Sequence, residues 1–128
     1  MMTLVHFLTG DGRYCVPVEA TVGVRSTAGL VPLPVPRPGV VGVLPADPPL
    51  TVLSVLGSGR DRILVLAAVG STFGLLVQEV TGLSSVDEAE IGRPPEGQDE
   101  ELVCGVVGGE RGLEFLADPA ALAKRLGA

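Results

Sequence analysis

Short apolar runs follow one another along the chain, and the clearest pair lies near its middle. Residues 63–69 and 73–77 are apolar and are separated by Gly70-Ser71-Thr72. Such lengths are typical of strands rather than helices. Both faces of the first run are apolar, so we expect it to be covered on both sides, whereas the second run should be half buried. The pattern predicts the central hairpin of an all-β domain.

Two other interpretations of residues 63–77 are a membrane hairpin and a buried helix. A membrane-spanning helix needs about 20 apolar residues. The stretch is shorter, has Gly-Ser-Thr in its middle and is preceded by Arg60 and Arg62. We therefore favour strands and expect no membrane insertion.

Similar runs elsewhere predict about eight or nine short strands. Those outside the centre are residues 4–8, 13–18, 40–44, 50–56, 102–107 and 113–116. Gly10-Asp11-Gly12 is a turn signal between the first two, and residues 108–112 should join the last two. Residues 19–24 are too short and too β-branched for a secure helix, although one helical turn fits them.

Residues 118–126 carry the signals of a terminal helix. Asp118 suits the N-cap and Pro119 the first helical position. Lys124 and Arg125 lie at the negative end of the helix dipole, and Gly127 can end the helix. Strands followed by one such helix predict a β-barrel or sandwich.

Two segments do not fit a core strand. Residues 30–38 have proline at every second position, at 32, 34, 36 and 38. Proline cannot donate to a sheet, so we expect an extended segment at an edge or on the surface. Such a segment can be a ligand for an aromatic groove, but a loop wrapped on the domain fits its apolar residues better. Residues 84–101 are polar and acidic, which favours a solvated connection with at most one strand or helical turn.

Composition narrows the class of protein. The length of 128 residues suits a single domain, residues 1–128, and the low aromatic content of 3% implies a core of Val, Leu and Ala. A net charge of −6 argues against nucleic acid and anionic membranes as partners. No secretory signal is visible at the N-terminus. Cys15 and Cys104 lie in apolar runs, so we expect small buried thiols of a reduced, cytoplasmic protein.

No group of residues suggests chemistry. His6 is the sole histidine, which we interpret as a strand-surface residue, and no nucleophile–histidine pair with an orienting partner is visible. Cys15 with His6 would make a thiol dyad, but the sequence offers no third group. Zinc needs about four ligands at short spacings, which one His and two isolated Cys do not supply. Gly57-x-Gly59 precedes a strand, whereas a phosphate loop precedes a helix. We expect no enzyme, no metal and no cofactor.

The order of these elements resembles the CheW-like domain, the coupling module of bacterial chemotaxis arrays, over nearly the whole chain. The family opens with a strand, a Gly turn and then Arg-Tyr-x-x-Pro with an acidic residue. In this chain, residues 5–7, 10–12 and 13–19 match these three parts. Its Pro-x-Pro and Gly-Val elements match residues 32–34 and 42–44. Its central hairpin matches Arg62-Ile63-Leu64-Val65, Gly70 and Gly74-Leu75-Leu76-Val77-Gln78-Glu79-Val80, and its late Gly-Val matches Gly105-Val106.

The resemblance implies two SH3-like five-stranded barrels that share an interface, with central strands crossing between them and a short C-terminal helix. It also implies a non-enzymatic adaptor. Ordinary members bind the cytoplasmic tip of a chemoreceptor and the regulatory domain of a histidine kinase, which is itself CheW-like.

One departure affects the expected partner. Where the family usually has Asn-Leu-Arg-Gly, this chain has Pro45-Ala46-Asp47-Pro48, so a charge is reversed and a turn glycine is lost. Charge reversal at an interface changes partner choice. We predict a contact surface along one strand and the following loop, together with the groove between the barrels. Its residues are Val40, Val41, Gly42, Val43, Leu44 and Asp47. The alternative is a divergent regulatory or accessory domain outside chemotaxis, with a new partner or a small apolar ligand.

Overall fold

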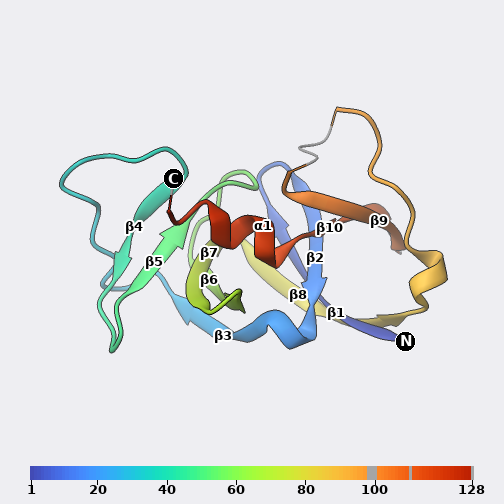
Figure 1. Cartoon of the computed structure of the whole chain (residues 1–128), viewed down its shortest axis with the longest axis horizontal. Helices are drawn as coiled ribbons and strands as arrows, with labels where there is room; N and C mark the ends of the chain where they lie inside the picture. The colour runs from blue at the N-terminus through green and yellow to red at the C-terminus, as the bar shows by residue number, and fades with distance from the viewer. Residues whose placement is uncertain (98–100, 110, 128) are drawn as a thin grey trace.

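The computed structural model describes residues 1–97, 101–109 and 111–127. Within them the chain forms ten strands, two short 3-10 turns and one helix (Figure 1). The strands are β1 Met2–Thr9, β2 Gly12–Pro17, β3 Thr21–Ser26, β4 Val40–Leu44, β5 Leu50–Leu53, β6 Arg62–Ala68, β7 Ser71–Val77, β8 Glu79–Val86, β9 Val103–Gly109 and β10 Gly112–Ala117. The 3-10 turns are η1 Val18–Ala20 and η2 Glu88–Glu90, and the helix is α1 Pro119–Lys124. The all-β class is confirmed.

The strands form two five-stranded barrels. The first barrel has the strand order β8-β1-β2-β10-β9, and the second has the order β3-β6-β7-β5-β4. In each, antiparallel neighbours are joined through one parallel pair, β10 with β2 and β5 with β7. The chain therefore starts in the first barrel, builds the whole second barrel and returns. This is the crossing arrangement that the resemblance implied.

Apolar side chains form three clusters, one inside each barrel and one shared between them. Strand β6 separates two of these clusters. Ile63 and Val65 point into the second barrel, whereas Leu64 and Leu66 belong to the shared core with Phe7 and Phe73. The prediction that this strand is covered on both faces is confirmed. The first barrel has its own small interior cluster, built around Leu4, Cys15, Val107 and Leu116.

The tip of the central hairpin differs from the prediction. The turn consists of Val69 and Gly70, with φ of 45° and 79°, and Ser71 and Thr72 belong to β7. A two-residue turn with positive φ at both positions matches the twist of paired strands. The hairpin is as predicted, but its hinge lies one residue earlier.

Two strands were missed, which is why the predicted number was too low. Residues 19–24 contain the end of η1 and most of β3, rather than a helical turn alone. Residues 84–86 end β8, so the acidic segment begins inside a strand and continues with η2. Both β3 and β8 are edge strands with mostly exposed residues, and their sequences therefore lack the apolar face that marks a core strand. Of that acidic segment, residues 98–100 lie outside the described part, as does Glu110 of the last turn.

The terminal helix is confirmed, although it is shorter than predicted. The Asp118 carboxylate accepts a hydrogen bond from the Ala120 backbone N–H at 3.0 Å, and Pro119 occupies the first turn. Leu122 and Ala123 are buried in the shared core. The helix lies at the junction of the two barrels (Figure 1). Within the described residues no helix combines the length and the hydropathy of a membrane span.

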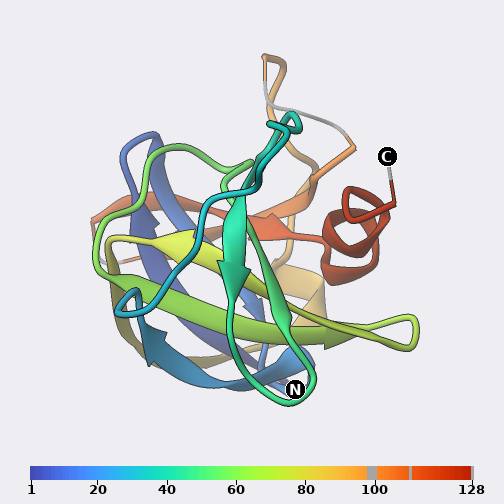
Figure 2. The same ribbon diagram turned by 90° about the vertical axis from the view of Figure 1, so that its left-hand side faces the viewer.

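The proline-rich segment, residues 30–38, forms a strap along the outer side of β4 (Figure 2). Val31 and Val43 exchange two backbone hydrogen bonds of 2.9 and 2.8 Å. The prediction of an extended, exposed edge segment wrapped on the domain is confirmed. Its Arg37 guanidinium also donates to the Leu126 carbonyl at 2.6 Å, which ties the strap to the end of the chain.

Candidate functional site

The predicted contact residues gather at one edge of the second barrel. Val40, Val41 and Val43 are half-buried on β4, and Asp47 is exposed in the loop that follows. Gly42 and Leu44 are buried, and Leu44 packs inside the barrel with Leu50 and Val52. Leu44 therefore supports the strand rather than offering a surface.

The strap changes what β4 can offer. Val43 already exchanges its backbone hydrogen bonds with Val31, and the N–H of Val40 donates to the Arg37 carbonyl at 3.2 Å. An incoming strand cannot pair at these positions without displacing the strap. The accessible part of the predicted surface is the Asp47 loop together with the half-buried valines.

A second surface lies between the barrels, where the sequence led us to expect a groove but named none of its residues. Val22 and Val24 on β3 and Leu83 on β8 are 64%, 48% and 67% exposed. Val24 lines a shallow groove with Glu79 and Val80 of β8, so the two strands, one from each barrel, meet there. We call Val22, Val24 and Leu83 the β3–β8 patch. The alternation of Val22 and Val24 is a sequence signal of a strand, but it cannot tell which way the valines face.

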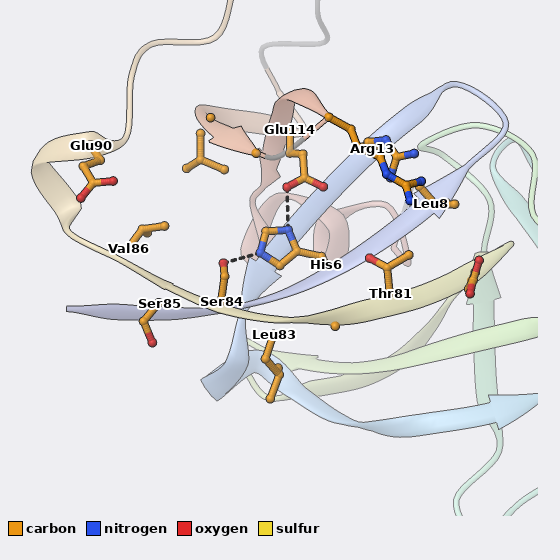
Figure 3. Close-up of a pocket in the computed structure, with 16 residues that line it drawn as sticks. His6, Leu8, Arg13, Thr81, Leu83, Ser84, Ser85, Val86, Glu90 and Glu114 are labelled. Carbon is orange, nitrogen blue, oxygen red and sulfur yellow. Dashed lines mark hydrogen bonds and ion pairs between the residues drawn. The ribbon is translucent and has the colours of Figure 1, made fainter.

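A groove lies between β8 and β9 in the first barrel (Figure 3). Its volume is about 720 Å³, and its lining includes His6, Arg13, Ser84, Gly108 and Glu114. β8 and β9 are the end strands of their sheet, and the order of strands does not close between them. The barrel is therefore open along this side.

His6 is the centre of a polar cluster in this groove. Its Nε2 atom lies 2.5 Å from the Ser84 hydroxyl oxygen, and its Nδ1 atom lies 2.9 Å from a carboxylate oxygen of Glu114. The His6 and Glu114 side chains are each only 12% exposed. The interpretation of His6 as a strand-surface residue is wrong, because His6 shares the interior-facing side of β1 with Leu4.

The two contacts of His6 differ in kind. The hydroxyl of Ser84 is at hydrogen-bond distance from Nε2, whereas the buried Nδ1 lies close to Glu114 without a well-directed hydrogen bond. Strands β1, β8 and β10 each supply one of the three groups (Figure 3). We expected no pairing of His6 with a hydroxyl or a carboxylate group, and the structure places His6 beside one of each.

The two cysteines have different surroundings. Both are free thiols; Cys15 is fully buried as predicted, but Cys104 is exposed, contrary to the prediction. Burial, followed by the nearby Glu114 and Cys104, raises the pKa of the Cys15 thiol to about 12. Although Cys15 pairs with His6 in the strand register, its thiol keeps its proton at neutral pH. This argues against the thiol dyad. Among the described residues, no three His, Cys, Asp or Glu side chains are placed to hold a metal ion.

Comparison with known proteins identifies the fold. No protein-family model matches the sequence, and no curated protein matches it closely. Among solved structures, the chain is similar to the scaffolding protein TtCheW from Thermoanaerobacter tengcongensis, with a TM-score of 0.83 and 17% identity. The match covers 94% of this chain and 86% of the other. The fold is CheW-like, and the resemblance noted in the sequence is confirmed at the level of the fold.

Proposed function

We propose that this chain is a cytoplasmic adaptor of bacterial chemotaxis-type signal transduction, which couples a chemoreceptor to a histidine kinase through protein–protein contacts. The fold supports this proposal, because it is shared with a protein described as a scaffold. Fold alone does not define function, so the proposal depends on a surface of this chain. The observation that carries it is the β3–β8 patch.

The β3–β8 patch has the features of a contact surface. Single exposed apolar residues are common, but here Val24 lies in the groove where β3 and β8 meet, and Val22 and Leu83 are exposed on the same two strands. Asp61, Arg62 and Glu79 border the groove beside Val24 and supply a charged rim. Exposed apolar residues beside such a rim suit the amphipathic helix of a receptor tip.

The second contact is the one predicted from the sequence, namely β4 with the Asp47 loop. We assign the kinase regulatory domain, or another CheW-like domain, to this edge. Asp47 is exposed and carries the opposite charge to the arginine that the family usually has there. A matching partner would present a basic side chain to Asp47.

The alternative function is a regulatory or accessory binding domain outside chemotaxis. The changed loop at residues 45–49 favours it, because that loop lies on the predicted partner surface. In this case the chain would keep the CheW-like fold and bind a different protein.

Co-purification of the tagged protein from its own cells tests the adaptor role. We expect a chemoreceptor or a histidine kinase among the recovered proteins. Val22→Asp with Val24→Asp should lower receptor recovery at least tenfold, because each carboxylate would be desolvated at the contact. Val69→Asp is the matched control, since Val69 is 73% exposed on the β6–β7 turn, outside the patch, and should leave recovery unchanged.

The loop is tested separately with Asp47→Arg, which should change kinase recovery and leave receptor recovery intact. Recovery of neither partner by the folded wild-type protein would contradict the adaptor role and favour the accessory function. Equal losses for the Val69 and Val22/Val24 variants would show that the patch is not the contact.

A further inference from the structure

We propose that Ser84, His6 and Glu114 form an acyl-transfer site in the groove between β8 and β9. Ser84 is the nucleophile, His6 the general base, and Glu114 the positioning residue that orients and supports His6. The three groups have the arrangement by which serine hydrolases are recognised on unrelated folds: a hydroxyl at one ring nitrogen and a carboxylate at the other.

The distances suit these roles. With the proton on Nδ1, Nε2 is free to accept the Ser84 proton at 2.5 Å. Removing that proton makes an imidazolium, and the Glu114 oxygen at 2.9 Å stabilises its charge. The Nδ1–carboxylate contact is poorly directed, which is common in the absence of substrate.

The scaffold holds the three groups in place. His6 and Glu114 are mostly buried, and all three side chains come from paired strands rather than from loops. Ser84 lines the groove, so a substrate in the groove can reach its hydroxyl (Figure 3). Sites on rigid elements keep the geometry that such chemistry needs.

The open edge of β8 offers donors for a substrate carbonyl. The N–H of Gln78 donates to the Leu8 carbonyl, which shows that Leu8 faces β8. Backbone groups alternate in direction along a strand, so His6 and Leu4 also face β8, and their partners Gly82 and Ser84 face back toward β1.

The backbone N–H groups of Leu83 and Ser85 consequently point to the unpaired edge. The amide that follows a nucleophilic serine is a frequent oxyanion donor, because it lies beside the carbon under attack. Here that amide belongs to Ser85. A substrate lying extended along β8 would place its carbonyl oxygen beside this donor.

The groove indicates the class of substrate. Its volume of about 720 Å³ is that of a small-molecule site. Arg13 and Arg111 line it together with Glu79 and Glu90, so its rim is polar and of mixed charge. A small polar ester fits this lining.

The chemistry is balanced without any cofactor. The Ser84 oxygen attacks the ester carbonyl, its proton passes to His6 Nε2, and the departing alcohol takes that proton as the ester bond breaks. Water then attacks the acyl-serine by the same route and releases the acid. The net reaction is ester plus water to acid plus alcohol.

A fluorophosphonate probe tests the site on the purified full chain. An activated serine displaces fluoride and forms a stable phosphonate ester, which mass spectrometry locates. We expect the adduct on Ser84, its loss in Ser84→Ala, and at least a tenfold slower reaction in His6→Gln. Ser58→Ala is the matched control, because the Ser58 side chain is exposed outside the groove and its loss should leave labelling unchanged.

The role of Glu114 is tested with p-nitrophenyl acetate. Glu114→Gln should lower kcat at least tenfold and leave KM unchanged, and Glu114→Asp should restore part of kcat. A merely structural role of Glu114 would not change kcat while leaving KM unchanged. Ser84→Cys gives a second measurement that leaves His6 in place, and the introduced thiol should react with iodoacetamide faster than Cys104.

Three results would overturn the proposal: no adduct on the folded wild-type chain, an adduct on another residue, or labelling that is unchanged in His6→Gln. None of these measurements involves a receptor or a kinase. Their failure is therefore distinct from failure of the adaptor role.

Discussion

The two barrels share one plan and differ in what fills them. Each has five strands, antiparallel neighbours and a single parallel pair. The second barrel is filled by aliphatic side chains, including Leu44, Val52 and Ile63. The first barrel is aliphatic around Leu4 and Leu116 but polar around His6 and Glu114.

The barrels also differ along the edges formed by β4 and β9. In the second barrel the strap pairs with β4 and covers that edge. In the first barrel, the connection that precedes β9 pairs with this strand only through the bridge between Gly92 and Val106. The groove opens beyond that bridge. The same topology therefore supports a packed core in one barrel and a polar groove in the other.

The largest expected effect tests whether the barrels are independent. Phe73 is fully buried in the shared core, opposite Leu66. Phe73→Ala should lower the free energy of unfolding by about 3–5 kcal/mol, because it leaves a cavity between the barrels. Urea unfolding followed by circular dichroism should show one transition at lower urea. Thr72→Ala, an exposed change on the same strand, is the control, and two transitions of which only one moves would contradict the shared core.

A smaller effect compares the two edges directly. A Cβ on Gly42 would approach the Val31 carbonyl oxygen, a backbone atom of the strap, to well within van der Waals contact. Gly42→Ala should therefore cost about 1–3 kcal/mol of stability. Gly108 on β9 has nothing within 4 Å of such a Cβ, so Gly108→Ala should change stability by less than about 0.5 kcal/mol. Equal costs, measured by urea unfolding, would mean that the edges do not differ as described.

The smallest effect concerns the thiol of the first barrel. The pKa of Cys15 is raised from 9.0 to about 12, mainly by burial, so the unfolded chain releases this proton first as pH rises. Stability should fall above pH 9, by about 1 kcal/mol between pH 8 and pH 10. Cys15→Ala should remove this part of the pH dependence in thermal or urea unfolding. Subtracting the pH dependence of Cys15→Ala from that of the wild-type protein cancels the contributions of other groups. Tyr14 is one of these groups, because burial also raises its pKa.

Iodoacetamide labelling at pH 8 gives an independent check on the same thiol. Cys104 is exposed and should be modified, whereas Cys15 should react only after unfolding. Rapid modification of Cys15 in the folded chain would show that the interior of the first barrel is accessible.

The sequence predicted the elements whose signals are local. The central hairpin has two apolar runs around a glycine, and the helix has Asp118 and Pro119 at its start. β3 and β8 were missed because an exposed edge strand has the composition of a connection. The exposed state of Cys104 was missed for a related reason, since an apolar run does not say which face of an edge strand is covered.

By itself, the sequence determined the all-β class, the CheW-like order of elements and the positions of the buried aliphatic residues. These depend on alternation and turn chemistry, which act between neighbours in the chain. Only the tertiary structure decided which edge is covered by the strap and which residues meet in the groove. Ser84 lies 78 residues from His6, and Glu114 comes from a third strand. Contacts over such separations follow from strand order and register, which no local pattern in the sequence encodes.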